Sequence, residues 1–335
     1  MSGERVREGL AAVLPRVSLT RAQSGEPGPL DDFVARVAGR RLRVRWVPRG
    51  TIGEVRRAIT RRPKPEVIMA PRLSAGAREA LDMARIGWID ESGAANVHTG
   101  TIIVVRESAP GLVRDRGPRK WTRATLGVAE ALLTGVTPTV DEVARTTGLS
   151  ASTAALALRL LTEQGLLRAD AARGRASGRQ LNEPKALLDT YAQQVAQLAP
   201  ALEVRAGVLW RDEVAGMVAL GAKWDRSGIS WAATGALSAA VLAPYGTQVS
   251  PLVVYVDAST PASLRSAVEK AGLKTMTGGR LLVRAFPTPV TARLAGTIAP
   301  GLHSVPWPTV YADLLGDAGV RSEEIAEALS DKMLG

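Results

Sequence analysis

Two different spacings of apolar residues occur in the first third of the chain. The stretch RRLRVRWV, residues 40–47, alternates apolar and polar positions as a half-buried strand does, and EVIMAP, residues 66–71, is a short apolar run typical of a buried strand. Helical spacing appears in residues 51–62 and 73–86, and further strands are predicted for DDFVARVAG, GWID and TGTIIVVRE. This alternation predicts an α/β domain over residues 1–110, with an opening helix and a Gly/Pro-rich link before the first strand.

The apolar pattern becomes helical from Trp121 onward, after a Pro/Gly-rich linker. In TRATLGVAEALLTG the apolar residues form a stripe that predicts a helix facing a core. Thr139 and Glu142 then have the spacing of a capping box at the start of VDEVARTTG. Gly148 stands where a left-handed residue would end that second helix.

A third helix and a hairpin are predicted to follow. Ser150 is placed to cap the helix ASTAALALRLLTEQG, and LLRADAARGRASGRQLNEP has the pattern of two strands with an arginine-rich tip. Three helices with this spacing, followed by a hairpin, predict a winged helix-turn-helix over residues 119–184. An ordinary three-helix bundle is the alternative.

A winged helix-turn-helix binds DNA by placing its third helix in the major groove. There Ser152 and Thr153 would contact phosphate, and Arg159 would contact guanine or phosphate. Ala155 or Leu156 would contact a thymine methyl group. The predicted DNA-binding residues of this segment are Ser150, Ser152, Thr153, Ala155, Leu156 and Arg159 in the third helix, with Arg173, Arg175 and Arg179 in the wing.

Positive charge is concentrated near the N-terminus. Residues 1–120 have 23 Lys and Arg against 13 Asp and Glu, whereas residues 186–335 have 12 against 13, and the whole chain has a net charge of +11. On a period-two strand Arg41, Arg43 and Arg45 share one face, which predicts a stripe that follows a DNA backbone beside the winged-helix site. Arginine makes up 36 of the 43 cations, which suits phosphate recognition but also follows from a GC-rich genome.

The N-terminal order of elements resembles the restriction-endonuclease fold. Such enzymes bind a divalent metal through an Asp on one strand and an acid-x-Lys pair on the next. Asp31 and Asp32 lie near the first position, but the following strand has Arg45 and no acid where the pair should be. We therefore expect a degenerate, non-catalytic domain, and we assign Asp90 and Glu91 to a turn in which Asp90 accepts hydrogen bonds from backbone amides.

Residues 186–335 predict an α/β C-terminal domain with little catalytic chemistry. Thr234 to Leu237, followed by the strand at 253–257, has a layout similar to nucleotidyltransferases, which need two carboxylates two residues apart. Tyr255 stands where the first would be, so we expect a close helix-on-strand packing instead. The acidic segment after residue 309 predicts a terminal helix that docks a partner or caps the fold in solvent. With no cysteine and two distant histidines, we expect neither a metal site nor a cofactor.

The segment EVIMAPRLSAGAREALDMARIGWIDESGAANV, and later SGISWAATGALSAAVLAPYG, PLVVYVD and VYADLLGDAGVRSEEIAEAL, resemble the AbiEi-type antitoxins of type IV toxin–antitoxin systems. The resemblance covers most of residues 30–332 in order. It implies a repressor that binds repeats in its own promoter through the winged helix, with a C-terminal domain that opposes a partner toxin. Stand-alone regulators of the same build are equally compatible with these residues.

The sequence thus predicts a cytoplasmic, nucleoid-associated regulator of transcription that binds double-stranded DNA, acts as a repressor and is not an enzyme. No signal peptide or membrane span is expected. The alternatives are a structural, replication or partition protein of a mobile element, and a metal-dependent nuclease or nucleotidyltransferase. A two-fold homodimer would match palindromic half-sites, whereas two DNA-contacting domains would let a monomer bind an asymmetric site.

Overall fold

The computed structural model describes residues 2–13, 17–21, 31–37, 40–91, 93–99, 102–106, 120–169, 179–198, 202–244, 251–317 and 320–335. The fold is mixed α/β and divides into two compact units. The first comprises residues 1–118 and 318–324, and the second comprises residues 119–317 and 325–335. Among the described helices, none is long and apolar enough to cross a membrane.

The first unit is built on a seven-stranded sheet with the strands in sequence order. Its centre, β3 to β5, is parallel, and the strands on either side are antiparallel. The strands are β1 (Val17–Arg21), β2 (Asp31–Val37), β3 (Arg40–Trp46), β4 (Val67–Ala70), β5 (Gly87–Asp90), β6 (Ala95–Thr99) and β7 (Ile102–Arg106). Two details differ from the prediction: β1 lies between the predicted opening helix and the Gly/Pro-rich link, where no strand was expected, and the strand expected at 99–107 is the second arm of a β6–β7 hairpin.

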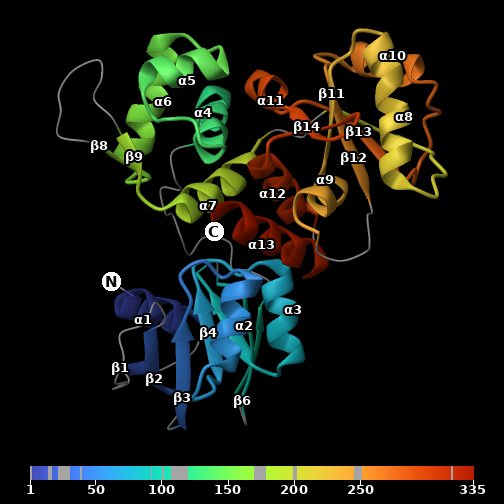
Figure 1. The fold of residues 1–335 in the computed structure, drawn as a ribbon. Helices are drawn as coiled ribbons and strands as arrows, with labels where there is room; N and C mark the ends of the chain where they lie inside the picture. The colour runs from blue at the N-terminus through green and yellow to red at the C-terminus, as the bar shows by residue number, and fades with distance from the viewer. Residues whose placement is uncertain are drawn as a thin grey trace. The chain divides into compact units, whose positions relative to one another are not determined.

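Alternate residues of the central strands face opposite layers of helix. In β4, Val67 and Met69 pack with α1 (Ser2–Val13) on one face of the sheet. On the other face, Ile68 packs with α2 (Ile52–Thr60) and α3 (Ala75–Met83). Figure 1 shows α2 and α3 side by side along the sheet. The two faces explain why β4 is apolar at every position.

Local hydrogen bonds fix the ends of these elements. The hydroxyl groups of Thr51 and Ser74 cap α2 and α3, and Glu323, which belongs to this unit, accepts hydrogen bonds from Ser74 Oγ and Gly76 N. Asp90 Oδ1 accepts from Ala94 N over 3.2 Å, which confirms the predicted turn. Its other carboxylate oxygen accepts from Arg78 Nη2 at 2.7 Å.

Arg45 is an internal residue, and the prediction that it extends a surface stripe is wrong. Its exposed fraction is 1%. The guanidinium donates two hydrogen bonds to Asp32 and one each to the carbonyl oxygens of Ala58, Arg61 and Pro63. All of these acceptors lie on β2, at the end of α2 or within three residues after it, so Arg45 joins the sheet to the helix layer.

The second unit begins with three helices and a two-stranded antiparallel hairpin. The elements are α4 (Arg123–Leu133), α5 (Val140–Thr147), α6 (Ala151–Glu163), β8 (Leu167–Ala169) and β9 (Arg179–Leu181). As predicted, Thr139 caps α5, Gly148 ends it with φ of 73°, and Ser150 caps α6. Of the predicted capping box only the threonine half forms, because the Glu142 carboxylate accepts from Arg145 instead.

A six-stranded mixed sheet of order β10-β13-β12-β11-β15-β14 forms the rest of this unit. Helices α8 and α10 pack on one face of the sheet, and α9 and α12 pack on the other (Figure 1). The strands are β10 (Glu203–Ala206), β11 (Trp231–Thr234), β12 (Leu252–Val256), β13 (Leu281–Ala285), β14 (Gly296–Ala299) and β15 (Leu302–Ser304). The helices are α7 (Pro184–Val195), α8 (Glu213–Arg226), α9 (Gly235–Leu242), α10 (Pro261–Lys270), α11 (Pro289–Leu294) and α12 (Trp307–Gly316), together with the part of α13 (Val320–Leu334) from residue 325 onward.

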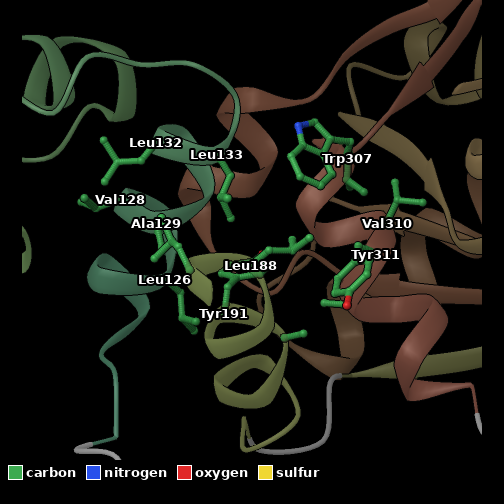
Figure 2. Close-up of a cluster of buried hydrophobic side chains, with 14 of the residues drawn as sticks. Leu126, Val128, Ala129, Leu132, Leu133, Leu188, Tyr191, Trp307, Val310 and Tyr311 are labelled. Carbon is green, nitrogen blue, oxygen red and sulfur yellow. The ribbon is translucent and has the colours of Figure 1, made fainter. Parts of the chain in front are cut away.

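One apolar core connects the three-helix segment to the rest of the second unit. Figure 2 shows Leu126 and Leu133 of α4, Leu188 and Tyr191 of α7 and Trp307 of α12, which all belong to one cluster of buried side chains. The boundary between the units falls at residue 118, next to the predicted start of the winged helix. The predicted boundary at 184–186 instead runs through this shared core.

Candidate nucleic-acid interface

Helix α6 has one buried face and one exposed face. Ala154, Leu158 and Leu161 are completely buried, as their spacing predicts, and they belong to the shared core. On the opposite face Ser152 and Arg159 are exposed, and Leu156 has an exposed fraction of 67%. Thr153 and Ala155 are partly exposed. The residues predicted to face DNA are therefore available to a ligand.

Hydroxyl groups gather at the N-terminal end of α6. Ser150 Oγ accepts from Thr153 N over 3.2 Å, and it lies 3.0 Å from Ser152 Oγ and 2.8 Å from Thr153 Oγ1. All three side chains are at least partly open to solvent. A helix N-terminus is electropositive, so hydroxyl donors there suit a phosphate group.

The charged residues of α6 occur only in its second half. Arg159 Nε donates to Glu163 Oε1 over 2.8 Å, and both side chains are at least half exposed. An exposed pair of this kind contributes about 0.3–0.5 kcal/mol, so the guanidinium can exchange Glu163 for a stronger acceptor. Residues 151–158 include no charged or amide side chain.

The hairpin brings two arginines next to α6. Arg168 on β8 is exposed and donates to Gln180 Oε1 at 3.2 Å. Arg179 on β9 is partly buried, and its Nε has no hydrogen-bond partner among the described residues. Arg173 and Arg175, which were predicted to contact phosphate, lie outside the described residues. Arg168 was not predicted.

Arg293 of α11 holds the turn between α5 and α6. Its Nε donates to Thr146 O over 2.9 Å, and its Nη2 lies 3.5 Å from Arg145 O. A Cβ atom on Gly148 would lie 3.3 Å from Arg293 Nη1, so the guanidinium rests against the turn itself. The sequence shows that the last carbonyls of α5 need donors, but not that the donor comes from more than 140 residues away.

In the first unit the exposed basic residues are arranged differently from the prediction. Arg41 and Arg43 on β3 are exposed, whereas Arg45 is buried. Arg36 on β2 is exposed and directly opposite Arg41. Directly paired residues share a face of the sheet, so Arg36 lies on the same face as Arg41 and Arg43. The exposed basic group on this face is therefore Arg36, Arg41 and Arg43, without Arg45. Asp32 accepts from Arg45 with both carboxylate oxygens.

The second unit contains a fully buried carboxyl group on α4. Glu130 of α4 accepts hydrogen bonds from Thr291 Oγ1 of α11, at 2.9 Å, and from Thr309 Oγ1 of α12. Thr309 Oγ1 is also 2.8 Å from the hydroxyl of Tyr191. Burial raises the pKa of Glu130 from 4.5 to about 7, because the two threonine hydrogen bonds only partly offset the loss of water.

Asp313 of α12 forms a second internal carboxyl site. It accepts from Thr234 Oγ1 at 2.6 Å and from the Tyr255 hydroxyl at 3.0 Å. Burial raises the pKa of Asp313 to about 6. Tyr255, at the position where a nucleotidyltransferase would have a carboxylate, is thus a hydrogen-bond donor to Asp313. The described residues include no group of three or more side chains arranged to bind a metal ion.

The shape of the candidate interface is set by α6, the hairpin and the Arg293 contact. Comparison of the chain with models of known protein families found no match, and no curated protein or solved structure matched it.

Proposed function

We propose that this protein is a DNA-binding regulator of transcription that inserts α6 into the major groove. The observation that carries the proposal is the exposed face of α6. A capped helix follows a glycine turn, packs one face on a core and exposes Ser152, Leu156 and Arg159 on the other, beside an arginine-bearing hairpin. We interpret these features as supporting a winged helix-turn-helix.

In this proposal the affinity comes mainly from phosphate contacts. The hydroxyl groups of Ser150, Ser152 and Thr153 and the amides at the start of α6 contact one strand. Arg168, Arg179 and the arginines between β8 and β9 contact the other side of the groove. Base contacts are left to Ser152, Ala155, Leu156 and Arg159.

We further propose that the protein is a repressor of the AbiEi type, as the resemblance of its sequence implies. In this proposal the first unit is a nuclease-like scaffold in which the Arg45 guanidinium binds both carboxylate oxygens of Asp32. The exposed Arg36, Arg41 and Arg43 of the same unit contact flanking DNA. Footprinting of the protein's own upstream region at two salt concentrations tests this role. A protected repeat supports the repressor, and protection without sequence preference favours a structural or partition protein.

Replacing Arg173, Arg175 and Arg179 together with Ala is expected to weaken DNA binding across all sequences. Each lost phosphate contact lowers the slope of log affinity against log salt by about 0.9, so the slope should fall by about 2–3. The measurement is a titration of labelled duplex at several salt concentrations. The matched control replaces Arg211, Arg226 and Arg265, three exposed arginines elsewhere in the second unit, and should leave the slope unchanged. Equal slopes for the two triple variants would show that the hairpin arginines do not contact DNA phosphates.

Arg293→Ala is expected to loosen the turn between α5 and α6. The Thr146 carbonyl loses its donor, and a hydrogen bond of this kind contributes about 0.5–1.5 kcal/mol. Amide hydrogen exchange should therefore become faster at Leu149 and in the first turn of α6, and DNA affinity should fall. Arg293→Lys retains the charge but not the planar group, so its exchange rates and DNA affinity should lie between those of Arg293→Ala and the unmodified protein. Unchanged exchange in Arg293→Ala would show that the turn does not depend on α11.

A further inference from the structure

Leu156 is the large apolar side chain that α6 presents to solvent. It is 67% exposed at the middle of the helix, while Leu158 and Leu161 on the other face are fully buried. One turn before it lies Ser152, and three residues after it lies Arg159. A hydroxyl group and a guanidinium therefore flank an aliphatic surface at the centre of the exposed face.

Charge determines which half of α6 can approach DNA. Glu163 is exposed near the C-terminal end of the helix and would repel phosphate, whereas residues 151–158 are uncharged and follow an electropositive helix start. The N-terminal half, together with Arg159 just after it, is thus the part that enters the groove. In that half Leu156 is the longest exposed side chain, so it reaches deepest toward the base edges.

We infer that Leu156 determines specificity by packing against the C5 methyl group of a thymine in the major groove. This inference rests on the proposed function. Among the four bases only thymine presents a methyl group there, while the neighbouring edges present hydrogen-bonding groups that an aliphatic side chain would leave unpaired. The site bound by α6 accordingly has an A·T pair at its centre, with the polar contacts of Ser152 and Arg159 on either side of it.

The test removes the methyl group without changing base pairing. Duplexes that bind the full-length protein are selected from a random pool, and each thymine is then replaced in turn by deoxyuridine. Burial of one methyl group corresponds to about a fourfold change in affinity, so one thymine per bound α6 should weaken binding by about that factor when replaced. A duplex with a 5-methylcytosine·guanine pair at the same position should bind more tightly than a duplex with a cytosine·guanine pair there.

Leu156→Ala connects the effect to this side chain. The variant should bind thymine and deoxyuridine duplexes equally, whereas Leu156→Met, which keeps an apolar side chain of similar length, should still distinguish them. Ser152→Ala is the matched control, because it alters the same face without the aliphatic contact and should retain the fourfold difference. Leu156 is exposed, so its replacement is expected to leave thermal unfolding unchanged, and this is checked alongside.

The possible failures are distinguishable. If no duplex is enriched and none binds, the proposed function is wrong and the role of Leu156 falls with it. If a duplex is selected but no thymine responds to deoxyuridine, or if the response persists in Leu156→Ala, DNA binding stands and the inference about Leu156 is wrong.

Discussion

Arg45→Met is expected to lower the free energy of unfolding of the first unit by about 3–5 kcal/mol, because it removes one partner of a buried ion pair. Methionine fills much of the volume of the arginine side chain but donates no hydrogen bond. Asp32 would lose both of its guanidinium contacts, and the carbonyl oxygens of Ala58, Arg61 and Pro63 would each lose a donor. Amide hydrogen exchange in β2 and β3 of the full-length protein measures the loss.

Arg43→Met is the matched control for this experiment. Arg43 lies two residues away on the same strand and is exposed, so its replacement should change stability by less than about 0.5 kcal/mol. Adding Asp32→Asn to Arg45→Met should recover part of the loss, since it removes the unpaired carboxylate. If Arg45→Met and Arg43→Met had the same small effect, the buried guanidinium would not be what joins β2 and β3 to α2.

The second large effect is a loss of stability of the second unit as pH rises. The pKa of Glu130 is about 7 in the folded protein and 4.5 without the influence of the fold. The folded state therefore retains a proton that the unfolded state releases, and the stabilisation is full below pH 4.5 and is lost as pH rises through 7. Each unit of pKa difference corresponds to about 1.4 kcal/mol, so the loss is about 3–4 kcal/mol. Asp313 acts in the same direction, with its change complete nearer pH 6.

Glu130→Gln should abolish most of this dependence. The amide cannot ionise, and it can still bond to the hydroxyls of Thr291 and Thr309. We expect the variant to be more stable than the unmodified protein at pH 8 and close to it at pH 5, as measured by urea unfolding. Glu163→Gln on the exposed face of α6 should leave the pH dependence as it was. Parallel curves for Glu130→Gln and the unmodified protein would mean that Glu130 is not protonated in the fold.

Features that depend on neighbouring residues could be predicted from the sequence. The caps at Thr139 and Ser150 and the turn at Gly148 were predicted correctly, because a hydroxyl acceptor or a left-handed glycine acts within a few residues. The two faces of α6 also follow from its own spacing.

Features that depend on distant parts of the chain could not be predicted from the sequence. A period-two pattern places Arg45 on a face of β3 but does not show that the end of α2 and the residues just after it offer Arg45 three carbonyl oxygens. The pairing of Arg36 with Arg41 depends on strand register, and β1 was not predicted because its alternation is only five residues long. Arg293 and Glu130 act through contacts across more than 140 residues, for which the pattern around each residue gives no signal.

The core shared by α4, α7 and α12 restricts how the proposed DNA specificity can be altered. Exchanging residues 119–184 for the corresponding helices of another protein would leave Leu188 and Trp307 facing a surface that was never shaped to cover them. The helices α4, α5 and α6 therefore cannot be exchanged as a unit without disrupting this core. New specificities, whether obtained by engineering or by natural divergence, would have to arise by substitutions on the outer face of α6 while its inner face stays as it is.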